Sequence, residues 1–170
     1  MKELFEDLDR RFSLKSFEQP RNDLGFITID TKDVVTLLTY VRDRREYTHL
    51  SFMTAVDRIE EGLFQLTYMV HNFESNHSLG VRTQFDRDNP ALDSVHHLWK
   101  QARTYQRELK EMFGIDFPGS PRVSEEFILE GWQEIPPMRR DFDTRKYSQE
   151  TYFPRPGRSS RDPRETMRRR

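Results

Sequence analysis

Apolar residues in the first half of the chain recur with spacings typical of alternating helices and strands. Spacings of three and four predict amphipathic helices over residues 1–13 and 34–46, on either side of a strand over Gly25–Asp30. Alternation of apolar and polar residues predicts strands over Leu63–Val70 and Leu79–Phe85. The alternating pattern indicates an antiparallel sheet with one buried face and one polar face.

A further strand is predicted around Leu50, with Phe52 and Thr54 expected on the same face as Leu50. The helix before it allows a crossover in the chain, and the short turns after it predict a meander of three strands. Another amphipathic helix is predicted to start at Asn89–Pro90 and to stop at Gly114. Its apolar stripe consists of Leu92, Val95, Trp99, Ala102, Leu109 and Phe113.

The order of these elements predicts an α+β fold. We expect a two-layer domain over residues 1–117, with a mainly antiparallel four-stranded sheet packed by helices, followed by an extended C-terminal arm. Residues 118–142 contain several prolines and little periodicity, and they are predicted to form an irregular interface segment. Residues 143–170 are polar and rich in arginine, and we expect an extended, basic, partner-binding tail there. The tail also carries Tyr147, Tyr152 and Phe153, which favour ordering on a partner.

Composition excludes several classes of chemistry. The sequence has no cysteine, which excludes disulfides, thiolate metal sites and cysteine-bound iron–sulfur clusters in this chain. Its five histidines show no metal-binding spacing, and the glycine-rich phosphate loops and nucleophile elbows are missing. Hydrophobic residues make up 34% of the chain and charged residues another 34%, which indicates either flexible segments or a domain that relies on partners.

Two sequence motifs carry more information than the periodicity. The first is Gln-Arg-Glu-Leu-Lys-Glu-Met-Phe-Gly-Ile at residues 106–115, and the second is Pro-Met-Arg-Arg-Asp-Phe at residues 137–142. In this order and spacing they resemble the signature of the thirty-kilodalton subunit family of respiratory complex I and of related membrane-bound hydrogenase complexes. The resemblance covers about residues 25–145 and implies the same α+β arrangement.

The chain departs from the family pattern at three places. Gln106 stands where the family usually has glutamate, and Ser120 stands where it has histidine. Ile135-Pro136 stands where the family often has Gly-His. These departures keep the branch related to membrane-bound hydrogenases open.

The resemblance implies a non-catalytic, peripheral-arm subunit of an NADH:quinone oxidoreductase-like complex with no catalytic centre of its own. Such a subunit braces a hydrogenase-like large subunit for electron transfer to quinone coupled to ion pumping. The expected partners are this large subunit and an iron–sulfur small subunit, in a hetero-oligomer. We expect no cofactor in this chain, iron–sulfur clusters in its neighbours, and no bound nucleic acid. The expected location is the cytoplasmic side of the cell membrane, peripheral and with indirect membrane contact.

The residues expected at the interface with partners come from the two motifs and from the segment between them. Arginine forks and carboxylates there suit an ion-pair network between subunits, and the aromatic residues suit apolar anchors, either in the core or at the interface. The candidates are Arg107, Glu108, Glu111, Phe113, Gly114, Trp132, Arg139, Arg140, Asp141 and Phe142.

Three alternatives remain open. The first is the equivalent subunit of a membrane-bound hydrogenase-type complex. The second is a small free-standing hydrolase or transferase that uses a histidine, such as His71 or His97, with a carboxylate. The third is a nucleic-acid adaptor that binds through the arginine-rich tail, which ends in Arg168-Arg169-Arg170.

Overall fold

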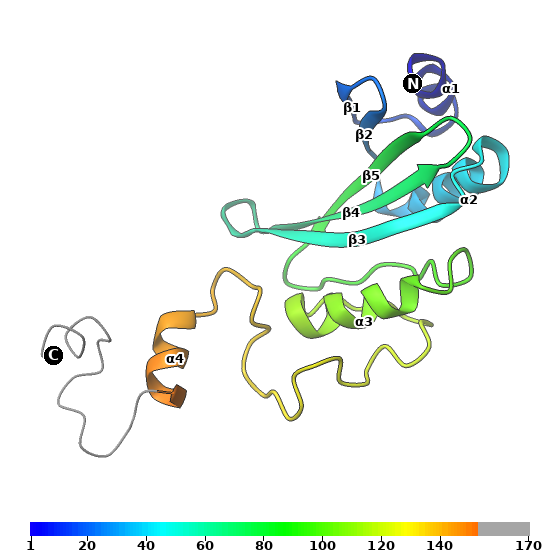
Figure 1. The fold of residues 1–170 in the computed structure, drawn as a ribbon. Helices are drawn as coiled ribbons and strands as arrows, with labels where there is room; N and C mark the ends of the chain where they lie inside the picture. The colour runs from blue at the N-terminus through cyan, green and yellow to red at the C-terminus, as the bar shows by residue number, and fades with distance from the viewer. Residues whose placement is uncertain (153–170) are drawn as a thin grey trace, which may run out of the picture. The chain divides into compact units, whose positions relative to one another are not determined.

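The computed structural model describes residues 1–152 and divides the chain into two compact units, with the boundary after Arg139. The first unit combines helices with a single β-sheet (Figure 1). Its elements are α1 (Lys2–Phe12), β1 (Ser16–Arg21), β2 (Leu24–Thr28), α2 (Val34–Arg45), β3 (His49–Arg58), β4 (Leu63–Asn72), β5 (His77–Asp86) and α3 (Ala102–Phe113). Short 3₁₀ turns at Thr31–Asp33 and Ile59–Glu61 precede α2 and β4.

The five strands lie in the order β1-β2-β5-β4-β3. β3, β4 and β5 form the expected antiparallel meander, and α2 carries the chain from β2 to the opposite edge of the sheet. The α+β class is confirmed, although β2 and β5 pair in parallel and the sheet has one strand more than predicted. The additional strand, β1, is exposed at all six residues, so its sequence lacks the alternation that marks a half-buried strand. Pro20 is tolerated there because β1 is an edge strand.

The hydrophobic core lies on one face of the sheet. On β4, Phe64, Leu66, Tyr68 and Val70 are fully buried, as their alternation predicts. They belong to one cluster that also contains buried residues of α1, α2 and α3, so the three helices cover this face. On the opposite face, Phe52 and Val56 of β3 are exposed.

The expected alternation in β3 is wrong after its second residue. A β-bulge between Leu50 and Phe52 shifts the register against β4. An extra residue reverses which face the following side chains occupy. Leu50 is therefore buried, whereas Phe52 is 41% exposed and Met53 takes its place in the core.

The third helix is shorter than predicted, because it begins at Ala102 and not near Pro90. Residues 90–92 instead pair with Asp116, through Leu92 N–H to the Asp116 carbonyl and Asp116 N–H to the Pro90 carbonyl. Leu92, Val95 and Trp99 are buried all the same. A series of turns, and not a helix, brings these three side chains into the core.

Side chains near the start of α3 hydrogen-bond to the outer edge of β3. Trp99 Nε1–H donates to the Thr48 carbonyl at 2.8 Å, and the Tyr105 hydroxyl donates to the Ser51 carbonyl at 2.8 Å. Gln101 Nε2–H donates to the carbonyl of Leu50. These bonds occupy main-chain acceptors of an edge strand and fix α3 beside it (Figure 1).

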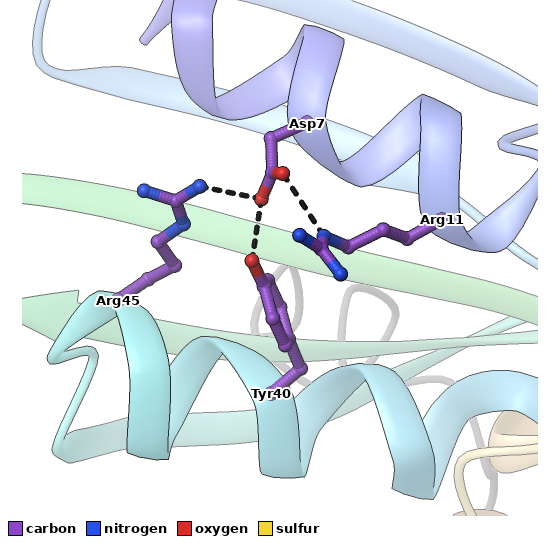
Figure 2. Close-up of polar contacts among 4 residues, drawn as sticks. All are labelled: Asp7, Arg11, Tyr40 and Arg45. Carbon is purple, nitrogen blue, oxygen red and sulfur yellow. Dashed lines mark hydrogen bonds and ion pairs between the residues drawn. The ribbon is translucent and has the colours of Figure 1, made fainter.

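One carboxylate joins α1 to α2. Asp7 accepts hydrogen bonds from the Tyr40 hydroxyl at 2.7 Å, from Arg45 Nη2 at 2.6 Å and from Arg11 Nε at 3.0 Å (Figure 2). The Tyr40 hydroxyl, followed by the two guanidinium groups, holds the pKa of Asp7 far below its ordinary value. Sequence patterns did not indicate this joint, because Asp7 and its partners on α2 lie far apart in the chain.

A buried ion pair links β3 to the segment after β5. Arg87 donates to both carboxylate oxygens of Asp57, at 2.8 and 3.0 Å. The side chain of Asp57 is 1% exposed and that of Arg87 is 11% exposed. The Arg87 guanidinium also lies 5.7 Å from the centre of the Phe64 ring, so this pair packs against the hydrophobic core.

The second unit begins at Arg140 and contains α4 (Thr144–Tyr152). Asp143 starts this helix, because its side chain accepts the Lys146 N–H at 2.9 Å. The Phe142 and Tyr147 rings are 5.5 Å apart. An extended chain was predicted from residue 143, so the helix is a correction over residues 144–152, and local capping explains it. The remainder of the predicted tail, including Phe153 and the terminal arginines, lies outside the described residues.

The Asp7 joint predicts a specific acid sensitivity. A carboxylate whose folded pKa is depressed stabilises the fold above its unfolded pKa of about 3.9, and this contribution is lost as pH falls through the folded pKa. Asp7→Asn is expected to lower the free energy of unfolding at pH 7 and to flatten its decline below about pH 4. Urea denaturation at several pH values measures both effects. Asp43→Asn, on the exposed side of α2, is the control, and an unchanged acid profile in Asp7→Asn would contradict the assignment.

The buried ion pair predicts that removing one of its charges costs more stability than removing both. Asp57→Ala leaves the Arg87 charge without its carboxylate and is expected to cost about 3–5 kcal/mol in chemical denaturation. Combining it with Arg87→Met is expected to recover much of this loss, since the uncompensated charge is then removed. Glu61→Ala breaks the exposed Arg58–Glu61 pair and is expected to cost at most about 1 kcal/mol. A loss in Asp57→Ala no larger than that of this control would refute the prediction.

Candidate subunit interface

Helix α3 places the first motif between the core and the surface. Ala102, Gln106, Leu109 and Phe113 form its buried face. Gly114 ends the helix in a left-handed conformation with φ of +77°, and its N–H donates to the Lys110 carbonyl at 2.9 Å. A side chain at Gly114 would meet the Pro136 ring, since an added Cβ would lie 3.2 Å from Pro136 Cγ. The left-handed conformation therefore favours glycine here, and an added Cβ would also be tightly packed against Pro136.

The structure brings the first motif against the start of the second. Met138 N–H donates to the Met112 carbonyl at 2.9 Å. Arg139 Nη2 lies 3.3 Å from the Arg87 carbonyl oxygen, and the Arg139 guanidinium is 5.3 Å from the centre of the Phe64 ring. Arg139, expected at a partner interface, thus contacts the end of this chain's own sheet beside the Asp57–Arg87 pair.

Glu111 holds the segment that follows α3. Its two carboxylate oxygens accept three consecutive backbone N–H groups, those of Phe127, Ile128 and Leu129, at 2.5, 2.9 and 3.1 Å. Residues 121–139 contain no helix or strand, so their backbone donors need such partners. Glu111, expected at an interface, thus has an internal hydrogen-bonding role in the structure.

The remaining candidates lie around this segment. The Arg107 guanidinium lies 5.3 Å from the Phe127 ring centre and 4.0 Å from the Glu125 carboxylate. Trp132 Nε1–H donates to the Ile135 carbonyl at 3.1 Å, and the predicted interface residue Phe113 is buried in the core. Glu108 is half-buried and has no hydrogen-bond or ion-pair partner among residues 1–152. Arg140, Asp141 and Phe142 belong to the second unit.

Gln106 and Ser120, two residues that depart from the family pattern, contact each other. The fully buried Gln106 Oε1 accepts the Ser120 hydroxyl at 2.7 Å and the Ser94 hydroxyl at 2.8 Å. His96 Nδ1 in turn lies 2.9 Å from Ser94 Oγ. A carboxamide and a hydroxyl thus form a neutral pair where a glutamate and a histidine would form a charge-assisted one. The sequence showed both departures but gave no sign that the two side chains meet.

Metal and membrane features are lacking in the described part of the chain. Within residues 1–152, groups of three or more histidine, aspartate or glutamate side chains that could hold a metal ion are not found. The described helices also lack the length and apolar character needed to cross a bilayer. The expectation that this chain binds no cofactor stays a prediction.

The Gln106–Ser120 contact predicts energetic coupling. Ser120→Ala is expected to cost about 1 kcal/mol of stability through loss of one buried hydrogen bond. Gln106→Glu alone buries a carboxylate and is expected to destabilise the domain, whereas adding Ser120→His supplies a cationic donor. A double-mutant cycle by urea denaturation is expected to give a favourable coupling of about 0.5–3 kcal/mol. Additive effects would show that the two positions do not interact.

Comparisons with known proteins agree with the motifs. Residues 27–148 match the family described as the respiratory-chain NADH dehydrogenase, 30 Kd subunit. The C subunit of the NADH-quinone oxidoreductase of Moorella thermoacetica is 25% identical over 142 residues, which cover 84% of this chain and 90% of that protein. The C/D subunit of the NADH-quinone oxidoreductase of Pseudomonas fluorescens is 27% identical over 151 residues, but the match covers only 25% of that protein and 82% of this chain.

A solved structure shares the fold. A chain of the membrane-bound sulfane sulfur reductase, an archaeal respiratory membrane complex, superposes with a TM-score of 0.77 at 23% identity. The superposition covers 89% of this chain and 90% of that chain. The match of the family over residues 27–148 confirms the expected family, and the chain belongs to the family of the 30 Kd subunit of the respiratory-chain NADH dehydrogenase.

Proposed function

We propose that this chain is a non-catalytic subunit of a complex-I-type NADH:quinone oxidoreductase. It occupies a peripheral position on the cytoplasmic side of the membrane and braces a hydrogenase-like large subunit beside an iron–sulfur small subunit. Electrons pass through clusters in these neighbours to quinone, and the whole complex couples this transfer to ion pumping. Family membership supports this assignment, as does the name of the Pseudomonas fluorescens relative, which joins the C and D subunits.

The single observation that carries the partner role is that the Glu108 carboxylate lacks a hydrogen-bond or ion-pair partner within residues 1–152. This carboxylate lies half-buried on α3, within the signature motif, and has no partner in the described part of the chain. A partly buried carboxylate gains from a cationic partner. A neighbouring subunit that brings an arginine or lysine to the outer side of α3 supplies this partner.

The names of the relatives favour one branch. Both relatives described above are named NADH-quinone oxidoreductase subunits, which favours this type of complex over the membrane-bound-hydrogenase alternative. The free-standing hydrolase and the nucleic-acid adaptor receive no support from the family match.

A pull-down of the full chain from native membranes in mild detergent tests the proposal. We expect recovery of a hydrogenase-like large subunit, an iron–sulfur small subunit and antiporter-like membrane proteins, identified by mass. The sequence of the recovered large subunit then separates the two branches, since a hydrogenase carries cysteine pairs for nickel and iron. Recovery of the chain alone would overturn the proposal.

A substitution at Glu108 tests the residue that carries the argument. Glu108→Gln is expected to reduce recovery of the large and small subunits about tenfold, because a charge-assisted contact between subunits is lost. Its unfolding midpoint is expected to stay within error of the wild type, since the side chain has no partner inside the described residues. Glu3→Gln on the exposed face of α1 provides the matched control. Normal recovery with Glu108→Gln would remove this residue from the interface.

A further inference from the structure

The segment after α3 is fixed before any partner arrives. Glu111 pairs three of its backbone N–H groups, Lys110 Nζ reaches Ser124 Oγ at 3.1 Å, and Met138 N–H reaches the Met112 carbonyl at 2.9 Å. Turns within the segment add bonds such as Trp132 N–H to the Leu129 carbonyl at 3.2 Å. A surface that is already ordered loses little conformational entropy on binding.

A hollow of about 280 Å³ lies between α3 and this segment. Val123, Leu129, Trp132 and Pro136 give it apolar lining, and Arg107 of α3 lines it as well. A concave site with apolar lining and charged groups around it is the usual form of a place that receives a side chain or a short segment.

Exposed aliphatic side chains occur on the same segment. Ile128 is 66% exposed, Ile135 is 44% exposed and Met138 is 57% exposed. Single exposed apolar residues are ordinary. Ile128 and Ile135, however, directly adjoin in sequence Leu129 and Pro136, which line the hollow.

The charges around the hollow define what can bind there. Arg107 lies 4.0 Å from Glu125, which itself pairs with Arg122 at 2.6 Å, and Lys110 pairs with Asp116. The carboxylates that line the hollow outnumber these two lining cations; they are Glu111, Glu125, Glu126 and Glu134. Glu134 lines the hollow, Glu130 lies on the same segment, and over residues 1–152 neither has an ion-pair partner. The uncompensated charge at this surface is therefore negative. The phosphates of nucleic acids and of anionic lipids would be repelled there.

We propose that this hollow receives a basic segment of a neighbouring subunit, one that carries lysine or arginine beside aliphatic side chains. The aliphatic groups enter the apolar lining and contact Ile128, while the cations face Glu130 and Glu134. This inference rests on the proposed function, because it takes the occupant to be a subunit of the same complex. It differs from the Glu108 contact because Glu108 does not line this hollow.

A charge-reversal experiment tests the inference. The double variant Glu130→Lys with Glu134→Lys is expected to recover about tenfold less large or small subunit than the wild type in the membrane pull-down. Glu3→Lys with Glu6→Lys, on exposed positions of α1, changes the net charge equally and is expected to stay within about twofold of wild type. Unfolding midpoints of both isolated variants verify that the fold is retained. Equal recovery in the two double variants would overturn the inference.

A cross-linking experiment identifies the occupant. The full chain with Ile128 replaced by photoreactive p-benzoyl-L-phenylalanine is irradiated within the complex, and the attached peptide is sequenced by mass spectrometry. We expect a peptide of a neighbouring subunit with lysine or arginine next to aliphatic residues. An acidic or uncharged peptide, or one from a second copy of this chain, would refute the proposal. Wild-type chain recovered without any partner would refute the proposed function itself and, with it, a neighbouring subunit as the occupant.

Discussion

The surface after α3 depends on the carboxylate of Glu111. Backbone outside helices and strands lacks their regular hydrogen bonds. Its N–H groups must therefore donate to side chains or to water. Glu111 pairs three in succession from a helix that is itself held by the core and by the edge of β3. Further along the segment, Trp132 N–H donates to the Leu129 carbonyl and Met138 N–H donates to the Met112 carbonyl. Hydrogen bonds to a helix thus hold in place a segment that has no regular structure of its own.

The signature residues divide into two groups with different roles. Gly114, Phe113 and Arg139 hold the chain together, through a tight helix end, burial in the core and contacts with Arg87 and Phe64. Glu108 has no hydrogen-bond or ion-pair partner within residues 1–152, and the proposed function assigns it a contact with a neighbouring subunit. Residues of one motif therefore need not share one role, since some hold the chain's own surface while another is proposed to contact a partner.

The sequence predicted what depends on local periodicity. The strands over β4 and β5 and the end of α3 at Gly114 agree with the structure, because alternating burial and a left-handed helix end leave direct marks in the sequence. The β3 bulge, the exposed edge strand β1 and the turns over residues 90–101 left no such mark. The Gln106–Ser120 contact and the Asp57–Arg87 pair were missed because each joins residues distant in sequence. Family resemblance located the motifs but did not show which of their residues face inward.

The bonds from Trp99, Gln101 and Tyr105 to the carbonyls of β3 affect the chain outside any complex. A protein that works within an assembly exists for some time as an isolated chain, at concentrations where exposed strand edges join one another into aggregates. The carbonyls of Thr48, Leu50 and Ser51 already accept hydrogen bonds from these side chains. A strand of another molecule therefore finds fewer free carbonyls to pair with along this edge. The same side chains that position α3 therefore protect the unassembled protein from self-association along this edge.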